Sequence, residues 1–168
     1  FASLQRMTRG STLRAELERN THWNRIYSTK ADDQVSWFET MPLVSLTLMQ
    51  AAGLDKHTCV IDVGCGDSRL VDHLVGQGLD CIAVLDVSAA ALSKAKARVG
   101  AGKVQWIEAD VTGEWVSQKP MDIWHDRAVF HFLTDADDRA QYRARLLRTL
   151  KPGGCHCRNL RTRRARNM

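Results

Sequence analysis

No apolar run in this chain approaches the roughly 20 residues that a membrane span requires. The first residues also lack the apolar stretch of a secretory signal. We therefore expect a cytoplasmic protein with no membrane partner. The 168 residues, 44% of them hydrophobic, suffice for one domain with a buried core.

The five cysteines include no Cys-x-x-Cys pair, and an odd number does not suit a disulfide framework. Cys59, Cys65 and Cys81 fall in or beside expected strands, where thiols serve as small apolar core residues. We therefore expect reduced cysteines and a reducing compartment. Cys155-His156-Cys157 offers too few ligands for zinc, so we expect no metal site.

The net charge of +5 comes from the end of the chain, because the last eleven residues hold five arginines and no acid. Without those five, 19 basic residues face 19 acidic ones. We expect one domain over residues 1–157 and a disordered basic tail over residues 158–168. Arginines without aromatic partners are weak evidence for nucleic-acid binding, so we expect no nucleic-acid partner.

Apolar runs alternate with helical patterns through the middle of the chain. Strands are expected at residues 58–63, 81–86, 103–108 and 121–125, with helices at 68–75, 88–98 and 136–150. Two further helices precede them, over residues 3–19 and after Thr40. This alternation predicts an α/β, Rossmann-like doubly wound fold, with a mainly parallel sheet and flanking helices.

The first strand ends in Gly64 and Gly66, a turn that lets a ligand lie against bare backbone. Asp62, Asp86 and Asp110 each fall at the end of an expected strand. Asp86 follows the loop by about 20 residues, the spacing of an acid that binds ribose hydroxyls. The third glycine of the dinucleotide pattern is replaced by Arg69, which argues against the alternative of a nucleotide-dependent oxidoreductase.

The chain resembles the class I S-adenosylmethionine-dependent methyltransferases over roughly residues 20–154. Within that family it is similar to small bacterial methyltransferases related to eukaryotic protein-lysine methyltransferases. The matching stretches are Asp62–Gly66, Val84–Ser88, Glu108–Val111, Asp122–Arg127, Lys151–Gly154, His22–Tyr27 and Val35–Phe38.

The resemblance implies S-adenosylmethionine as the cofactor and a small-molecule or protein side-chain methyl acceptor. It implies cofactor contacts from Asp62, Gly64, Cys65, Gly66, Asp86, Val87, Asp110, Val111 and Asp126, with Trp23 and Tyr27 as a lid. Methyl transfer is an in-line displacement that needs a base only for a protonated acceptor. Asp126, His125 and His131 are the candidates for that base.

The chain departs from the family after Lys151–Gly154, where a fifth strand and a hairpin normally follow. Residues 155–168 show no strand alternation, so we expect the C-terminal strands to be missing or replaced and strand four to expose an edge. A reading-frame shift near Gly154 is one explanation. Two alternatives to an active methyltransferase stay open: a truncated or inactive cofactor-binding remnant, and a nucleic-acid binder using the tail. The oligomeric state is open.

Overall fold

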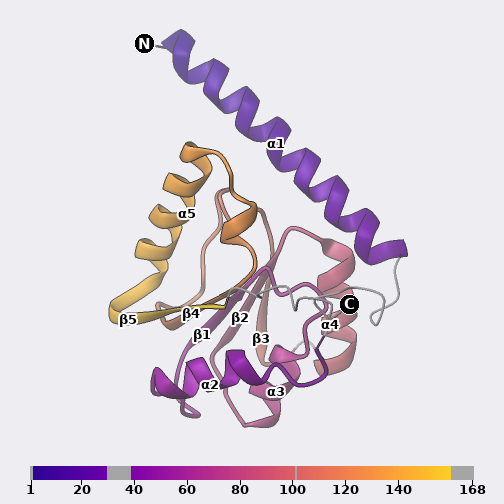
Figure 1. Ribbon diagram of the computed structural model, residues 1–168, viewed down its shortest axis with the longest axis vertical. Helices are drawn as coiled ribbons and strands as arrows, with labels where there is room; N and C mark the ends of the chain where they lie inside the picture. The colour runs from indigo at the N-terminus through magenta and orange to yellow at the C-terminus, as the bar shows by residue number, and fades with distance from the viewer. Residues whose placement is uncertain (1, 30–38, 101, 160–168) are drawn as a thin grey trace, which may run out of the picture.

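The structure is a computed structural model that describes residues 2–29, 39–100 and 102–159. Its centre is a five-stranded sheet in the order β3-β2-β1-β4-β5, in which every neighbouring pair is parallel (Figure 1). The strands are β1 (Val60–Val63), β2 (Ile82–Asp86), β3 (Val104–Glu108), β4 (Met121–Arg127) and β5 (Leu150–Asn159). The predicted parallel sheet is confirmed.

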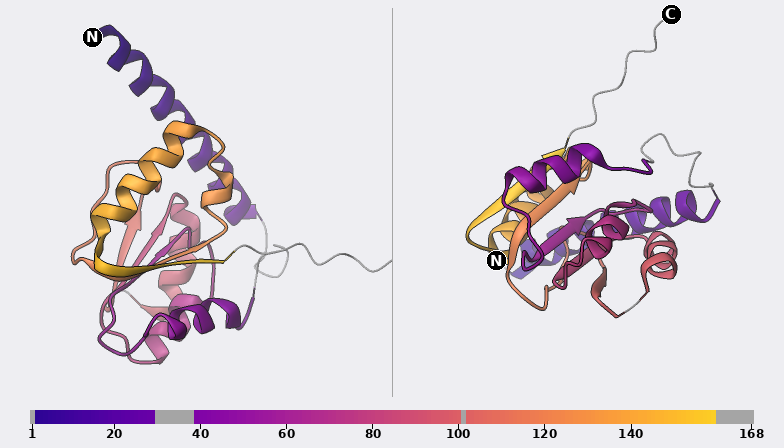
Figure 2. Two further views of the ribbon diagram at one scale, coloured as in Figure 1. Left: turned by 60° about the vertical axis from the view of Figure 1, so that its left-hand side comes forward. Right: turned by 90° about the horizontal axis from the view of Figure 1, so that it is seen from below.

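Helices cover both faces of this sheet, as the doubly wound prediction requires (Figure 2). They are α1 (Ala2–Thr29), α2 (Leu43–Ala51), α3 (Leu70–Gly76), α4 (Ala89–Val99) and α5 (Ala136–Thr149), with the short 3-10 helix η2 (Phe130–Phe132). Leu46, Leu74 and Leu92 of α2, α3 and α4 pack in one core cluster, and Tyr142 of α5 packs in the other. Among the described residues, no helix has the length and apolarity that crossing a bilayer demands.

Local sequence signals account for several helix ends. Ser88 caps α4, because its hydroxyl accepts a hydrogen bond from the amide of Ala91. α2, the helix expected after Thr40, begins at Leu43 with Pro42 in the capping position. The first helix is longer than predicted: α1 continues to Thr29 and projects beyond the sheet at its N-terminal end (Figure 1).

The expectation that the fifth strand is missing is wrong. Residues 150–159 form β5, which pairs in parallel with β4, so β4 is not an edge strand. Cys157 packs into the core cluster beside α2, and the side chains of His156 and Arg158 point to the opposite face, near Tyr142 and Phe130. The sequence did not reveal this alternation of buried and outward-facing side chains, because the buried members are thiols. β5 ends at Asn159, and the rest of the expected tail lies outside the described residues.

The expectation of reduced core cysteines is also wrong for one pair. Cys59 and Cys81 form a disulfide, with their Cα atoms 4.6 Å apart. The parallel register pairs Val60 with Ile82, which places the two preceding residues side by side at the start of β1 and β2. Cys65, Cys155 and Cys157 are free thiols.

Thiol titration checks this pairing. In denaturant without a reductant, we expect three of the five cysteines to react, and all five after reduction. Replacing Cys59 and Cys81 together with alanine should lower the free energy of unfolding by about 3 kcal/mol, because the bridge closes a loop across a separation of 22 residues. Five reactive thiols before reduction would contradict the pairing.

Candidate functional site

Four buried acids lie in a row along the carboxyl edge of the sheet. Asp110 follows β3, Asp86 ends β2, Asp62 lies in β1 and Asp126 lies in β4. The order in which the chain adds strands to the sheet reverses between β1 and β4, which are parallel neighbours although β2 and β3 separate them in sequence. Ligands of open α/β sheets bind outside the carboxyl ends at such a point.

Asp86 joins the two loops that begin at this edge. Its Oδ2 accepts a hydrogen bond from the amide of Gly66 at 2.8 Å, and its Oδ1 accepts one from the amide of Ser88 at 2.8 Å. Burial raises the pKa of Asp86 to about 6, and these two amide bonds oppose that rise. A carboxylate has about four acceptor positions, so two remain for a ligand.

Asp62 forms a pair with His125, its register partner on β4. Oδ1 of Asp62 lies 2.7 Å from Nδ1 of His125, and each side chain is 2% exposed. The other oxygen of Asp62 and Nε2 of His125 are buried without a hydrogen-bond partner. His125 is therefore too deeply buried to reach a methyl acceptor directly.

Asp110 is held by its own turn and by α1. Its Oδ1 accepts bonds from the amide and the hydroxyl of Thr112, at 2.8 and 2.6 Å. Its Oδ2 accepts a bond from Nε of Arg19 at 2.6 Å, and the same guanidinium pairs with Asp138 at 2.9 Å. Arg19 was not predicted, because nothing in the sequence marks a contact over 91 residues.

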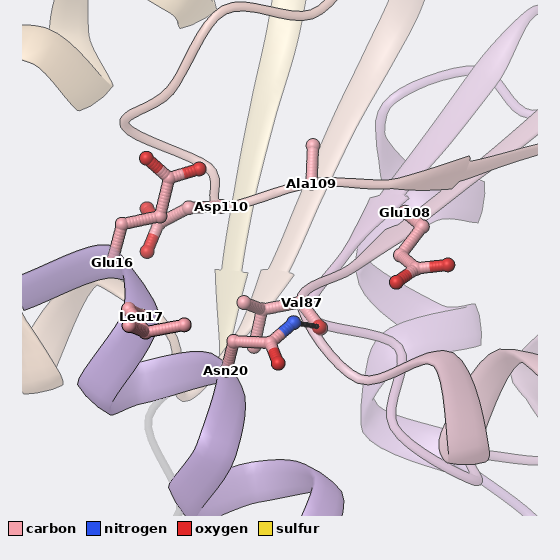
Figure 3. A pocket seen from close by; sticks show the side chains of 7 residues that line it. All are labelled: Glu16, Leu17, Asn20, Val87, Glu108, Ala109 and Asp110. Carbon is pink, nitrogen blue, oxygen red and sulfur yellow. Dashed lines mark hydrogen bonds between the residues drawn. The ribbon is translucent and has the colours of Figure 1, made fainter. Parts of the chain in front are cut away.

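A cavity of about 320 Å³ separates α1 from the ends of β2 and β3. Asn20 of α1 spans it by donating a hydrogen bond to the carbonyl of Val87 at 2.7 Å (Figure 3). The lining residues are Glu16, Leu17, Asn20, Val87, Glu108, Ala109 and Asp110 (Figure 3). Val87 and Asp110, two of the expected cofactor contacts, line this cavity, whereas the side chain of Val111 packs in the core beside Trp115.

The glycine loop is closed by protein side chains on two sides. Gly64 and Gly66 have φ of +66° and +53°, which disfavour any residue with a Cβ. A Cβ at Gly64 would meet the side chain of Val129, and one at Gly66 would meet the hydroxyl of Tyr27. Cys65 lies between these two glycines, and burial raises the pKa of its thiol well above its ordinary value. This cysteine is therefore a packed thiol.

The predicted lid residues connect α1 to the loop after β4. Tyr27 is buried against the glycine loop. The Trp23 ring meets the ring of Phe132 edge to face, with their centroids 5.4 Å apart. Phe132 itself is 54% exposed and lies 4.1 Å from the ring of His131. Aromatic side chains of α1 and of the segment after β4 therefore lie beside the glycine loop.

Asp126 is fully buried, and both of its oxygens are occupied. Oδ1 accepts a bond from the amide of Val129 at 2.8 Å; Oδ2 accepts bonds from the amide of Phe130 at 3.1 Å and the hydroxyl of Tyr142 at 2.7 Å. These bonds fix a turn in which Ala128 has φ of +77°. In this geometry Asp126 shapes the turn after β4, and the exposed His131 is the remaining base candidate.

No cluster of three or more His, Cys, Asp or Glu side chains suited to a metal ion occurs in the described part of the chain.

Comparison with known proteins matches residues 60–154 to the family model described as a methyltransferase domain. An uncharacterised methyltransferase of Mycobacterium tuberculosis and its counterpart in Mycobacterium bovis are each 28% identical over 96 residues. The alignment covers 57% of this chain and 47% of each relative, so the chain spans about half the length of the curated relatives it matches.

Solved structures share the fold at low sequence identity. The N-methyltransferase NodS of Bradyrhizobium japonicum, solved with S-adenosylhomocysteine, superimposes with a TM-score of 0.65 at 16% identity. That match covers 81% of this chain and 70% of NodS. A methyltransferase of Thiobacillus denitrificans, also solved with S-adenosylhomocysteine, gives 0.56 at 24% identity, over 69% of this chain and 47% of that one.

The crowded glycine loop predicts a sharp contrast between two alanine substitutions. Gly64→Ala should lower the free energy of unfolding by at least about 2 kcal/mol, because it adds a Cβ at positive φ against Val129. Gly76→Ala, at the open end of α3, is the matched control and should be neutral or stabilising by up to about 1 kcal/mol. Equal urea midpoints for the two variants would contradict the packing at Gly64.

The turn after β4 predicts a stabilising substitution. Ala128→Gly should raise the free energy of unfolding by about 0.5–1 kcal/mol, because glycine adopts positive φ without steric cost. Ala140→Gly, on the exposed side of α5, should instead lower it by about 1 kcal/mol. Chemical denaturation of both variants checks the sign, and destabilisation by Ala128→Gly would refute this turn geometry.

Proposed function

This chain belongs to the family of methyltransferase domains, and we propose that it transfers a methyl group from S-adenosylmethionine to an acceptor bound beside η2. The observation that carries the proposal is the position of Asp86. This buried acid ends β2, contacts the glycine loop and has acceptor positions left for two hydroxyls. Such an arrangement suits the ribose of a nucleoside cofactor.

The remaining residues of the edge fit the other parts of that cofactor. The cavity beside Val87 and Asp110 is the place for adenine, with one acceptor position of Asp110 still open beside its three bonds. The glycine loop, with the unpartnered Oδ2 of Asp62 behind it, suits the cationic methionine end. Arg69 in place of a third glycine makes a dinucleotide less suitable.

When bound, S-adenosylmethionine supplies an activated methyl group on a sulfonium. The chain's own residues then have to position the reactants and exclude water, which can account for much of the acceleration. Tyr27 and Val129 close the glycine loop from two sides, and Asp126 fixes the turn that carries Val129. No side chain needs to form a covalent bond.

The requirement for a base depends on the acceptor. Asp126 and His125 are buried and hydrogen-bonded, which leaves His131 as the exposed titratable group beside Phe132. An acceptor that is already deprotonated, such as a thiolate or a neutral amine, needs none of them. The proposed acceptor is a small molecule or a protein side chain. A cytoplasmic location is part of the proposal.

The alternative function is that of an inactive module that binds the cofactor without transferring methyl groups. One observation favours it: both oxygens of Asp126 are occupied by hydrogen bonds. Binding without turnover over a broad panel of nitrogen, oxygen and sulfur acceptors would support this alternative.

Calorimetric titration with S-adenosylhomocysteine, with NAD as the comparison ligand, tests the cofactor site. We expect saturable binding of the first ligand alone. Asp86→Ala should abolish it, because the substitution removes the ribose acceptor and releases the Gly66 amide. Asp80→Ala, an exposed acid just before β2, is the matched control and should bind normally. Binding of NAD, or normal binding by Asp86→Ala, would overturn the proposal.

The raised pKa of Asp86 adds a pH dependence to this binding. Only the charged carboxylate offers all its acceptor positions, and a pKa of about 6 leaves most of it protonated at pH 5. The dissociation constant for S-adenosylhomocysteine should therefore rise about tenfold between pH 7 and pH 5. An affinity that stays constant over that range would contradict this role of Asp86.

A further inference from the structure

A second cavity, of about 450 Å³, lies between η2, α5 and β5 at the outer edge of the sheet. α5 and β5 are the last helix and the last strand described, and they lie side by side (Figure 1). None of the residues that line this cavity was predicted from the sequence as a site residue, and none lines the cavity beside α1. A volume of this size holds a small organic molecule.

One wall of this cavity is apolar. The rings of Phe130 and Tyr142 meet edge to face, with their centroids 5.1 Å apart. Leu146 and Leu147 of α5 continue the wall, and Leu147 is 63% exposed. Aromatic and aliphatic side chains gathered around a cavity suit the apolar body of a ligand.

Three arginines surround the apolar wall: Arg139 and Arg143 of α5 and Arg158 of β5. The guanidinium carbons of Arg139 and Arg158 lie 5.7 and 5.1 Å from the centroid of the Phe130 ring. None of the three forms an ion pair with a residue that the structure describes, and no described acid lines the cavity. Like charges repel each other at such positions, so a bound anion would be favourable there.

The other two polar residues of the cavity add no charge to it. Burial lowers the pKa of His156, so its imidazole is neutral at pH 7. The hydroxyl of Tyr142 donates to Oδ2 of Asp126 at 2.7 Å. The positive charge therefore belongs to the guanidinium groups, each of which can bind a carboxylate or a phosphate through two parallel hydrogen bonds.

Phe130 connects this cavity to the proposed site of methyl transfer. Its ring lines the cavity, and its amide donates to Oδ2 of Asp126 at 3.1 Å. The preceding residue, Val129, closes the glycine loop at Gly64. Two consecutive residues after β4 therefore contact the glycine loop and the second cavity.

We propose that the second cavity binds the methyl acceptor, which is a small organic acid with an apolar body and a carboxylate or phosphate group. The arginines bind the anionic group, and the apolar wall contacts the body. The end of the acceptor nearest Phe130 carries the atom to be methylated. This inference rests on the proposed function and narrows its acceptor to one chemical class.

The experiment is an NMR titration of the isotope-labelled chain, saturated with S-adenosylhomocysteine, with three probes of similar shape. Phenylacetate carries a carboxylate, phenyl phosphate carries a phosphate, and phenylacetamide is the neutral counterpart. The double variant Arg143→Gln/Arg158→Gln removes two of the three charges. Arg148→Gln is the matched control, because Arg148 is an exposed arginine of α5 outside the cavity.

We expect at least one of the two anions to shift the amide resonances around Phe130, α5 and β5. It should bind at least about tenfold more tightly than phenylacetamide, and the double variant should weaken it by about tenfold or more. Arg148→Gln should bind it normally. Equal affinity for the anions and phenylacetamide, or normal binding by the double variant, would overturn the inference. The comparison of probes on the wild-type chain decides the question even when the double variant does not fold.

Repeating the titration without S-adenosylhomocysteine separates this inference from the proposed function. An acceptor has to be bound together with the cofactor, so both ligands should occupy the chain at once. Displacement of the anion by S-adenosylhomocysteine would overturn the role as acceptor site. A folded chain that binds S-adenosylhomocysteine but neither anion would overturn this inference alone. A folded chain that does not bind S-adenosylhomocysteine would refute the proposed function, and the acceptor role with it.

Discussion

The site depends on the two hydrogen bonds that the buried carboxylate of Asp86 accepts from backbone amides. By accepting bonds from Gly66 and Ser88, it ties the loop after β1 to the loop after β2. The first loop carries the glycines and the second begins α4. Because the carboxylate is buried, both amides are needed to hold it charged, and its pKa still rises to about 6. A buried charge of this kind is costly in isolation, which supports the proposal that ligand hydroxyls share it.

α1 packs along the same edge of the sheet and contacts both loops. Arg19 reaches Asp110, Asn20 reaches the carbonyl of Val87, and Asn24 accepts bonds from the Ser88 hydroxyl and the Ala90 amide. Tyr27 then lies against Gly66. One helix thus crosses the edge from the end of β3 to the glycine loop and forms one wall of the cavity between them (Figures 1 and 3).

Sequence periodicity predicted the parallel strands and the acids at the strand ends, because those features follow from neighbouring residues. Arg19 could not be predicted, since its partners lie about 90 and 120 residues away and only the tertiary fold joins them. The Cys59–Cys81 disulfide depends on strand register, which cysteine spacing does not reveal. β5 was missed because thiols occupy its inward positions, and a thiol is a weaker apolar signal than Val or Ile.

The sequence predicted which strand end carries the candidates for a base, but it did not predict that two of them are buried. Asp126 and His125 do lie at the end of β4, yet each is buried and bonded to a neighbouring element. Sequence alone does not distinguish an acid that faces a ligand from one that fixes a turn, since both follow a strand. In the structure Asp126 and His125 form hydrogen bonds that hold neighbouring residues in place. His131 and Phe132 are the exposed residues of this region.

A crystal structure of this chain with S-adenosylhomocysteine would test the central claim most directly. The ribose hydroxyls should lie within hydrogen-bond distance of Asp86, with adenine in the cavity between α1 and the end of β3. A ligand bound elsewhere, or one that leaves Asp86 with only its two amide partners, would contradict the cofactor site described above.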